Sequence, residues 1–291
     1  MDRSETHPAP PSPAIQDLRE RLAAYAAAPS PDPDAVRAAV EELLDLLERG
    51  EVRAAWPDAE GRWQVASWIK SGLILGFRHS DVVPMPPAGP MHFRDKAIYP
   101  VQSAERLASV RIVPGGSAVR RGAYVGPGAV LMPPCYINMG AWVGPGTMID
   151  SHALVGSCAQ IGAGVHLSAG AQVGGVLEPP GAMPVIVEEG AFVGGLAALV
   201  EGVRVRRGAV IGAGVILTAS TPVYDLPGER VLRAGEDGVL EIPERAVVVP
   251  GSRPLAGRWA RQHGLAASAA LIVKRRDEGT DARAALEEAL R

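Results

Sequence analysis

A spacing of six residues dominates the middle of this chain and constrains its fold more than any other feature. Aliphatic residues recur at this spacing in two runs with seventeen members, and a small or β-branched residue follows four positions later in fifteen of the repeats. Neither an α-helix, with a period of 3.6, nor a simple strand, with a period of two, gives this pattern. A fixed period of six that is rich in glycine and β-branched residues predicts a parallel β-helix. The aliphatic positions are Val119, Val125, Leu131, Ile137, Val143, Ile149, Val155, Ile161, Leu167, Val173, Val187, Val193, Leu199, Val205, Ile211, Leu217 and Val223.

The period also predicts the dimensions of this β-helix. Each repeat is expected to form one short strand and one turn, and three repeats are expected to close a triangular coil. Coils that stack at about 4.8 Å give five to six coils and a prism on the order of 25–30 Å long. The alternative, a β-sandwich with coincidental spacing, is disfavoured by seventeen matching positions. Paired glycines are expected to supply turn conformations, at Gly126, Gly128, Gly144, Gly146, Gly162, Gly164, Gly212 and Gly214.

Length and charge limit the classes of partner. The chain has 291 residues and a formal net charge of −3, which suits one main domain with appendages and argues against nucleic acid as a partner. The first thirty residues do not resemble a signal peptide, and no apolar run approaches the roughly 18 residues of a membrane span. Cys135 and Cys158 lie at or beside inward corners of the repeat and are expected to be reduced and buried. These features predict a cytoplasmic protein without a membrane partner.

The chain is predicted to contain four parts. The N-terminal part is proline-rich and expected to be flexible, although it contains a short helical pattern over 14–28. The third part, a β-helix, is interrupted by a segment that cannot fit within a coil and must project sideways. Such loops are often functional. The parts are a flexible N-terminus (1–33), an α-rich N-terminal domain (34–109), a parallel β-helix (110–225) with an extruded loop (174–186), and a C-terminal cap (226–291).

Local signals predict the elements outside the prism. In the N-terminal domain, Asp32 and Pro33 are typical of a helix start and Gly50 of its end. A hairpin is expected around the turn 57–61, and a second helix over 67–77. The C-terminal cap is expected to contain strands over 245–249 and 269–273 and a closing helix over 281–290, and to cover the open end of the prism.

Several strings within the repeats resemble the tetrahydrodipicolinate N-succinyltransferase family, which acts in the succinylase branch of diaminopimelate and lysine biosynthesis. The resemblance covers about four fifths of the chain, and its most specific strings are those over 156–162 and 174–179. The matching strings are Gly146-Thr147-Met148-Ile149-Asp150, Gly156-Ser157-Cys158-Ala159-Gln160-Ile161-Gly162, Gly174-Gly175-Val176-Leu177-Glu178-Pro179, Val165-His166-Leu167-Ser168, Val130-Leu131-Met132-Pro133 and Val200-Glu201-Gly202-Val203.

The resemblance implies an all-β main domain, a left-handed parallel β-helix, that assembles as a homotrimer. It also implies that acyl-CoA, as co-substrate, lies in the groove between neighbouring prisms, covered in part by the extruded loop, and that a small amine acceptor binds between subunits. No permanently bound cofactor and no metal are expected. The implied acyl-CoA contacts are Gly175, Gly195, Ser220, Lys274 and Arg275; the last two could instead be solvated.

Two charged residues match positions at which the family binds the acceptor. Asp150 follows Ile149 where other repeats carry glycine, and it matches the aspartate that meets the acceptor's amino group; a carboxylate there can accept a proton from the amine. The alternative role is that of a turn residue. Arg111 matches an arginine that binds the acceptor's carboxylate, for which a guanidinium fork is suited. It could equally be an ordinary surface residue.

The chain departs from the family pattern close to these positions. Where the family shows Arg-Ser-Glu, this chain has Leu196, Ala197 and Ala198, and so lacks an arginine and a second carboxylate. After the aspartate the family shows Thr-Trp, whereas this chain has Ser151 and His152. The predicted substrate-binding positions are therefore Arg111, Asp150, Ser151, Leu196 and Ala198.

Two imidazoles enter the catalytic prediction. His152 is predicted to act with Asp150, because an imidazole with a pKa near 6.5 can accept a proton at neutral pH. Its alternative role is to fill space at a subunit contact. His166 is a second candidate base, but it lies inside a string that the family uses structurally.

These observations favour a CoA-dependent N-acyltransferase that moves a succinyl or other short acyl group to an amino-acid-like amine, with an acceptor that differs from the family's. Two alternatives stay open: an authentic tetrahydrodipicolinate N-succinyltransferase, and a non-catalytic scaffold that binds acyl-CoA. A metal-dependent β-helix such as a carbonic anhydrase is a weaker alternative. It needs three histidines, and the prism contains only His152 and His166.

Overall fold

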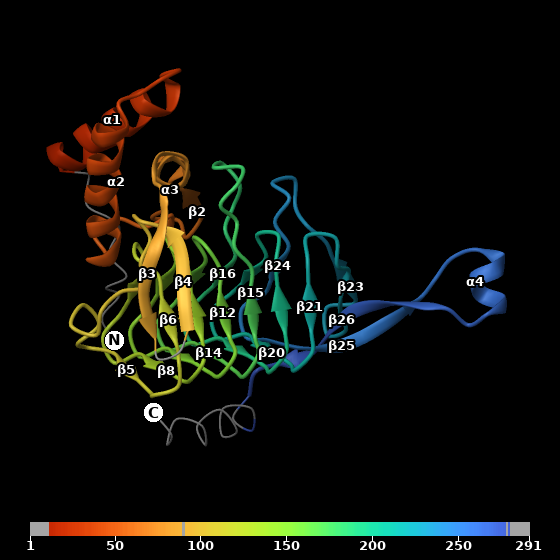
Figure 1. Cartoon of the computed structure of the whole chain (residues 1–291). Helices are drawn as coiled ribbons and strands as arrows, with labels where there is room; N and C mark the ends of the chain where they lie inside the picture. The colour runs from red at the N-terminus through yellow and green to blue at the C-terminus, as the bar shows by residue number, and fades with distance from the viewer. Residues whose placement is uncertain (1–11, 89–90, 278, 280–291) are drawn as a thin grey trace.

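The computed structural model describes residues 12–88, 91–277 and 279, and its centre is a parallel β-helix with three sheets (Figure 1). Tyr124 pairs with Trp142, and Trp142 pairs with Gln160, so neighbouring coils are 18 residues apart in the chain. Three repeats of six therefore form each coil, as the sequence predicts. In the two-residue strands that follow Arg111–Ile112, the second residue is buried in the core.

The three sheets are named here after one strand of each. The β7 sheet contains β7 (Tyr124–Val125), β10 (Trp142–Val143), β13 (Gln160–Ile161), β16 (Ile186–Val187), β19 (Arg204–Val205) and β24 (Glu241–Ile242). The β8 sheet contains β5 (Arg111–Ile112), β8 (Val130–Leu131), β11 (Met148–Ile149), β14 (His166–Leu167), β17 (Phe192–Val193) and β20 (Val210–Ile211). The β9 sheet contains β6 (Ala118–Val119), β9 (Tyr136–Ile137), β12 (Leu154–Val155), β15 (Gln172–Val173), β18 (Ala198–Leu199) and β21 (Ile216–Leu217).

The core of the prism is the set of residues that the repeat predicts. All seventeen aliphatic positions are buried, with no more than 8% of any residue exposed, and they belong to one hydrophobic cluster. The small residues four positions later fill the corners and are buried too, apart from Thr221, which is half-buried. The pattern is confirmed residue by residue because every coil presents the same inward positions.

The glycines of the repeat have two different roles. Gly146 has a φ of +63°, a left-handed conformation that favours glycine. Gly144 does not have a positive φ; a Cβ there would lie 2.5 Å from the backbone nitrogen of Ala163 in the next coil. The prediction that all eight glycines supply turn conformations is therefore wrong for half of them, where close stacking of coils excludes a side chain: Gly126, Gly144, Gly162 and Gly212.

An α-rich region precedes the prism. Asp32 caps α2 by accepting a hydrogen bond from the Asp34 backbone, and the predicted helices and first hairpin are confirmed. The second hairpin, formed by β3 and β4, was not predicted. The elements are α1 (Pro13–Ala27), α2 (Pro33–Glu48), β1 (Ala55–Pro57), β2 (Trp63–Val65), α3 (Ser67–His79), β3 (Val82–Ala88) and β4 (Met91–Lys96).

Helix α1 corrects one expectation about the N-terminus. The segment 1–33 was predicted to be flexible, but within it residues 13–27 form a helix. Leu18 and Leu22 are no more than 1% exposed and pack in the same cluster as the apolar residues of α2 and α3. Burial of these two side chains holds α1 in place, despite the prolines around it.

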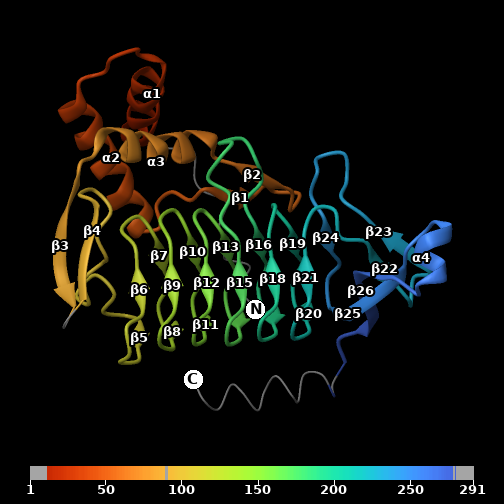
Figure 2. The same cartoon turned by 45° about the vertical axis from the view of Figure 1, so that its right-hand side comes forward.

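Polar and aromatic residues fix the α-rich region to the β7 sheet. The rings of Tyr124 and Trp142 stack at 4.1 Å, and the guanidinium of Arg53 lies 4.3 Å from the Trp142 ring centre. Arg53 also donates to Gln160 at 2.9 Å, and the Trp63 indole donates to Glu188 at 3.1 Å. Figure 2 shows α3 and the β1–β2 hairpin running along one side of the prism.

The C-terminal segment both extends the β8 sheet and projects beyond the prism. β25 (Ala246–Pro254) pairs with β20, and it forms a hairpin with β26 (Ala266–Arg275), which also pairs with β22 (Val223–Asp225). The outer half of this hairpin, with α4 (Arg258–Gln262) at its tip, extends past the last coil (Figure 1). The strand predicted over 245–249 overlaps the start of β25, and the strand predicted over 269–273 lies inside β26; both are about half as long as the observed strands. β23 (Arg230–Leu232) pairs with β22, and the predicted helix over 281–290 lies outside the described residues.

Candidate active site

Asp150 lies at the corner where the chain passes from the β8 sheet to the β9 sheet. The next coils place other predicted residues at the same corner, because Gly170 donates to the Ser151 carbonyl at 2.8 Å and Leu196 donates to the Ala169 carbonyl at 3.0 Å. This line of residues is called the Asp150 edge. It consists of Asp150–His152, Ser168–Gly170 and Gly194–Leu196, so it brings together Asp150, Ser151, His152, Gly195 and Leu196.

The carboxylate of Asp150 has two neighbours. One oxygen accepts a hydrogen bond from the backbone of Ser151 at 2.6 Å, and the other lies 3.8 Å from Nε2 of His166. The His166 side chain is 9% exposed and the Asp150 side chain 29% exposed. The ring of Phe192 meets His166 edge-on at 5.2 Å. A partly exposed carboxylate beside a buried imidazole can accept and hold a proton.

The imidazole beside Asp150 is thus that of His166, the second candidate base, rather than that of His152. His152 adopts a φ of +61° and is exposed, and its backbone donates to Pro134 at 2.6 Å and accepts from Gln172 at 3.1 Å. The sequence contains a signal for the His166 contact: His166 is 18 residues after Met148, so it lies beside Met148 in the next coil.

Of the remaining predicted acceptor residues, Leu196 lies on this edge, whereas Arg111 and Ala198 lie on the sheets to either side of it. Arg111 is exposed in β5, on the β8 sheet. It lies two coils before Met148, and Met148 pairs with His166 of the following coil. Leu196 is 75% exposed with a φ of +58°. Ala198 faces outward from β18 on the β9 sheet, paired with Gln172 and Ile216. Neither Leu196 nor Ala198 supplies the charged side chain that the family pattern has at its position.

Two predicted acyl-CoA residues lie at the opposite edge of the β9 sheet, which is called the Gly175 edge. It consists of Gly156–Cys158, Gly174–Gly175, Val200–Gly202 and Thr218–Ser220. Val176 donates to the Ser157 carbonyl at 3.2 Å, and Ala219 donates to the Glu201 carboxylate at 3.1 Å. Within one chain, the β9 sheet therefore separates Gly175 and Ser220 from Asp150.

The two basic candidates lie elsewhere, on β26. Lys274 forms an ion pair with Asp277 at 2.6 Å, and Arg275 donates to the buried carboxylate of Asp225 at 3.2 Å. A phosphate group would have to compete with these carboxylates for either side chain. In this structure Arg275 anchors β26 to the end of β22.

Comparison with known proteins identifies the family. Two family models match: "Tetrahydrodipicolinate N-succinyltransferase N-terminal" over residues 14–79, and "Hexapeptide repeat of succinyl-transferase" over residues 184–219. The 2,3,4,5-tetrahydropyridine-2,6-dicarboxylate N-succinyltransferase of Rhodopseudomonas palustris strain BisA53 is 44% identical, over 88% of this chain and 90% of its own. The protein of the same name from Nitrobacter hamburgensis is 45% identical over the same shares. This chain belongs to the tetrahydrodipicolinate N-succinyltransferase family.

Membership of this family confirms that the chain is an acyltransferase. It also confirms the predicted fold class, an all-β left-handed parallel β-helix with a small α-rich N-terminal domain and a C-terminal capping segment. The family chemistry uses a CoA-linked co-substrate.

The cysteines of this acyltransferase are not suited to nucleophilic roles. Both are free and buried, as predicted. Burial raises the pKa of the Cys135 thiol, and burial raises the pKa of the Cys158 thiol to about 12. Both therefore stay protonated at neutral pH, and thiolates rather than thiols are the nucleophiles.

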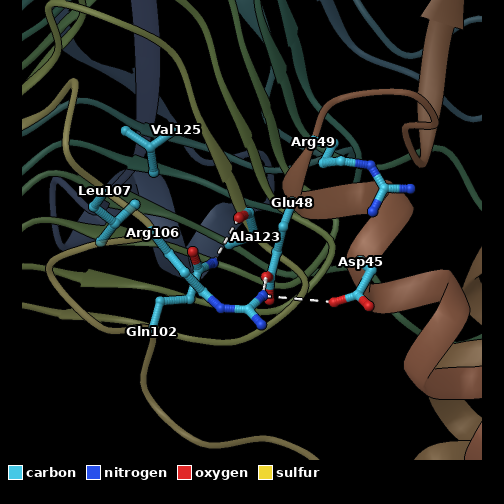
Figure 3. A pocket seen from close by; sticks show the side chains of 8 residues that line it. All are labelled: Asp45, Glu48, Arg49, Gln102, Arg106, Leu107, Ala123 and Val125. Carbon is cyan, nitrogen blue, oxygen red and sulfur yellow. Dashed lines mark hydrogen bonds and ion pairs between the residues drawn. The ribbon is translucent and has the colours of Figure 1, made fainter.

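A cleft of about 330 Å³ lies between α2 and the first coils of the prism (Figure 3). Its wall carries an ion-pair cluster in which Arg106 contacts Glu48 and lies 3.5 Å from Asp45. None of its lining residues is a predicted site residue. They are Asp45, Glu48, Arg49, Gln102, Arg106, Leu107, Ala123 and Val125.

Residues 12–88, 91–277 and 279 contain no group of three or more histidine, cysteine, aspartate or glutamate side chains that could hold a metal ion. No helix among them is long and apolar enough to cross a membrane.

Proposed function

We propose that this acyltransferase moves a succinyl group from succinyl-CoA to the amine of an amino-acid-like acceptor, and that this acceptor differs from tetrahydrodipicolinate. The observation that carries the proposal is the composition of the Asp150 edge. It keeps a carboxylate beside a buried imidazole, while the neighbouring positions Leu196 and Ala198 carry no charge. The aspartate of the family pattern is present, whereas its arginine and its second carboxylate are replaced by Leu196 and Ala198.

The proposed reaction is aminolysis of a thioester. Asp150 accepts a proton from the acceptor's ammonium group. The buried imidazole of His166 lies beside this carboxylate. The free amine attacks the thioester carbonyl carbon, and a backbone N–H of the glycine-rich edge donates to the resulting oxyanion. The tetrahedral intermediate then breaks its carbon–sulfur bond; the departing CoA thiolate takes the proton that the attacking nitrogen loses, and Asp150 later releases its own proton to solvent. Holding both substrates together supplies about 7–11 kcal/mol of the rate enhancement.

The proposed acceptor carries one carboxylate. Arg111 provides a guanidinium that suits a carboxylate, whereas Leu196 offers only an apolar surface where the family pattern has a second arginine. A dicarboxylate would lose one ion pair at this pocket. His152 is exposed two residues along the same edge, and we assign it to contact with the acceptor.

A specific observation favours the authentic family reaction as the second candidate. The two relatives named above are 44% and 45% identical to this chain over 88% of its length. Identity at this level extends over most of the chain. It is compatible with an unchanged acceptor if another side chain replaces the lost charge.

We further propose a homotrimer. The Asp150 edge and the Gly175 edge flank the β9 sheet, so a second prism packed along this sheet would enclose acceptor and acyl-CoA residues in one groove. Leu196 is 75% exposed and Ile216 is 59% exposed on this side of the chain. Sedimentation tests the assembly: a fully active monomer at micromolar concentration would exclude it.

Thiol release from succinyl-CoA tests the reaction, with acetyl-CoA as the comparison thioester. The amine panel contains tetrahydrodipicolinate, α-amino acids with one carboxylate, and a blank. The proposal expects the highest kcat/KM for an acceptor with one carboxylate. Efficient turnover of tetrahydrodipicolinate would instead support the second candidate. Thiol release no faster than the blank with every amine would support the non-catalytic scaffold.

A further inference from the structure

Lys70 is a buried lysine that connects two distant parts of the chain. It lies in α3, its residue is 0% exposed, and its Nζ donates to the backbone carbonyl of Ala182 at 2.6 Å. Ala182 belongs to the extruded loop 174–186. The hydrogen bond therefore joins the α-rich region to the loop across 112 positions of sequence.

The surroundings of Lys70 make this contact important for the loop. Burial lowers the pKa of Lys70, and the structure shows no ion pair for it among the described residues. The nearby thiol of Cys158 stays protonated at neutral pH because burial raises its pKa to about 12. A buried ammonium needs a hydrogen-bond partner, and the carbonyl of Ala182 provides one. A loop that moved away would leave this charge without it.

The loop has few other anchors to the α-rich region. It leaves the prism at the Gly175 edge, one coil beyond Cys158, where Val176 donates to Ser157 at 3.2 Å. Leu177 packs against the hydrophobic cluster of the α-rich region. Figure 2 shows the loop, in green, rising beside the end of α3.

We propose that Lys70 is a positioning residue for acyl-CoA binding: it holds the loop 174–186 in the conformation that covers the thioester substrate. This inference rests on the proposed function and on the expectation, implied by the family resemblance, that the extruded loop covers acyl-CoA. Through this bond the α-rich region, which contributes no residue to the Asp150 edge, sets the affinity for one substrate only.

The variant Lys70→Met removes the ammonium and keeps most of the buried volume. Lys96→Met is the matched control, because Lys96 Nζ also donates to a backbone carbonyl, that of Ser80 at 2.7 Å, and is remote from the loop. Hydrogen exchange of the bonded amides of Val176 and Ala182 measures loop opening directly. We expect exchange there to rise about 10- to 100-fold in Lys70→Met, the factor that one hydrogen bond to a charged group provides, and to stay unchanged in Lys96→Met.

The kinetic result expected of Lys70→Met is a KM for succinyl-CoA raised about tenfold or more, with the KM for the amine unchanged. Unchanged loop exchange would overturn the inference, and so would faster exchange throughout the protein, which would show a general structural role. Faster loop exchange with an unchanged KM for succinyl-CoA would also overturn it. If the wild-type protein transfers no acyl group, the proposed function fails, while the exchange measurement still decides whether Lys70 holds the loop.

Discussion

Glu188 should contribute strongly to the junction between the α-rich region and the prism. Its carboxylate is 16% exposed and accepts from Arg204 at 2.6 and 2.8 Å, from the Trp63 indole at 3.1 Å and from the Arg207 backbone at 3.0 Å. Trp63 lies in β2, whereas Arg204 lies in β19, so one carboxylate connects the two parts. The substitution Glu188→Gln keeps the volume and removes the charge.

The expected loss of stability follows from these contacts. Hydrogen bonds to charged groups contribute about 1.5–3 kcal/mol each, and the amide retains one acceptor oxygen. Arg204 keeps a second carboxylate, that of Glu241 at 3.0 Å, which limits the cost of leaving its guanidinium buried. We therefore expect Glu188→Gln to lower the free energy of unfolding by about 2 kcal/mol. At about 2–4 °C per kcal/mol for a large domain, Tm should fall by about 4–8 °C.

The pH dependence gives a second, independent readout. Burial acts to raise the pKa of Glu188, but Arg204, Trp63 and Arg206 together outweigh burial, and the net effect lowers this pKa below its usual value of 4.5. A group with a lowered pKa contributes stability that is fully present above the unfolded pKa and is lost as pH falls through the folded pKa. The difference in Tm between wild type and Glu188→Gln should therefore be constant near pH 7 and shrink below pH 4.5.

Thermal unfolding followed by circular dichroism at pH 7, 5, 4 and 3 measures both effects. Glu189→Gln is the matched control, because Glu189 pairs at 2.9 Å with Arg207, in an exposed contact that should contribute little. Equal Tm values for wild type and Glu188→Gln at pH 7 would refute the energetic reasoning. A Tm difference that persists unchanged to pH 3 would refute the assignment of the acid-sensitive group.

Three further predictions concern the edge and the coil stacking. Asp150→Asn should lower kcat at least tenfold without changing Tm, because acid–base catalysis commonly contributes about 10²–10⁴-fold; a wild-type rate would make Asp150 a turn residue only. The double variant Leu196→Arg/Ala198→Glu should raise kcat/KM for tetrahydrodipicolinate at least tenfold, and no change in this assay would disprove the role given to these two positions. Gly144→Ala should lower the free energy of unfolding by about 1–3 kcal/mol, since its Cβ would lie 2.5 Å from backbone of the next coil; an unaltered denaturation midpoint contradicts this.

The repeat predicts the prism well because a β-helix gives each position of the period one fixed environment. Val155 and Val173 are both fully buried for the same reason, although they lie in different coils. The spacing alone did not explain Gly144, because its constraint comes from the backbone of the next coil rather than from its own conformation. Likewise, local patterns located parts of β25 and β26 but not their ends, which depend on how far the two strands pair with each other.

The sequence located Asp150 but did not decide whether His152 or His166 lies beside it. His166 follows Asp150 by sixteen positions, and the contact becomes evident only when the register of 18 residues places Met148 next to His166. Lys70 gave no local signal at all. Its partner is a backbone carbonyl in a loop without regular structure, so neither residue type nor spacing could indicate the contact.

The two edges of the β9 sheet explain how an enzyme of this family could change its acceptor without losing its thioester. The residues assigned to the acceptor, Asp150 and Leu196, lie on one edge, whereas Gly175 and the extruded loop lie on the other. Each edge is built by its own stack of corners, which backbone hydrogen bonds join and side-chain contacts such as that of Glu201 with Ala219 supplement. Substitutions such as Leu196 and Ala198 therefore alter outward side chains at one edge, while the core, the loop and its bond to Lys70 keep their geometry.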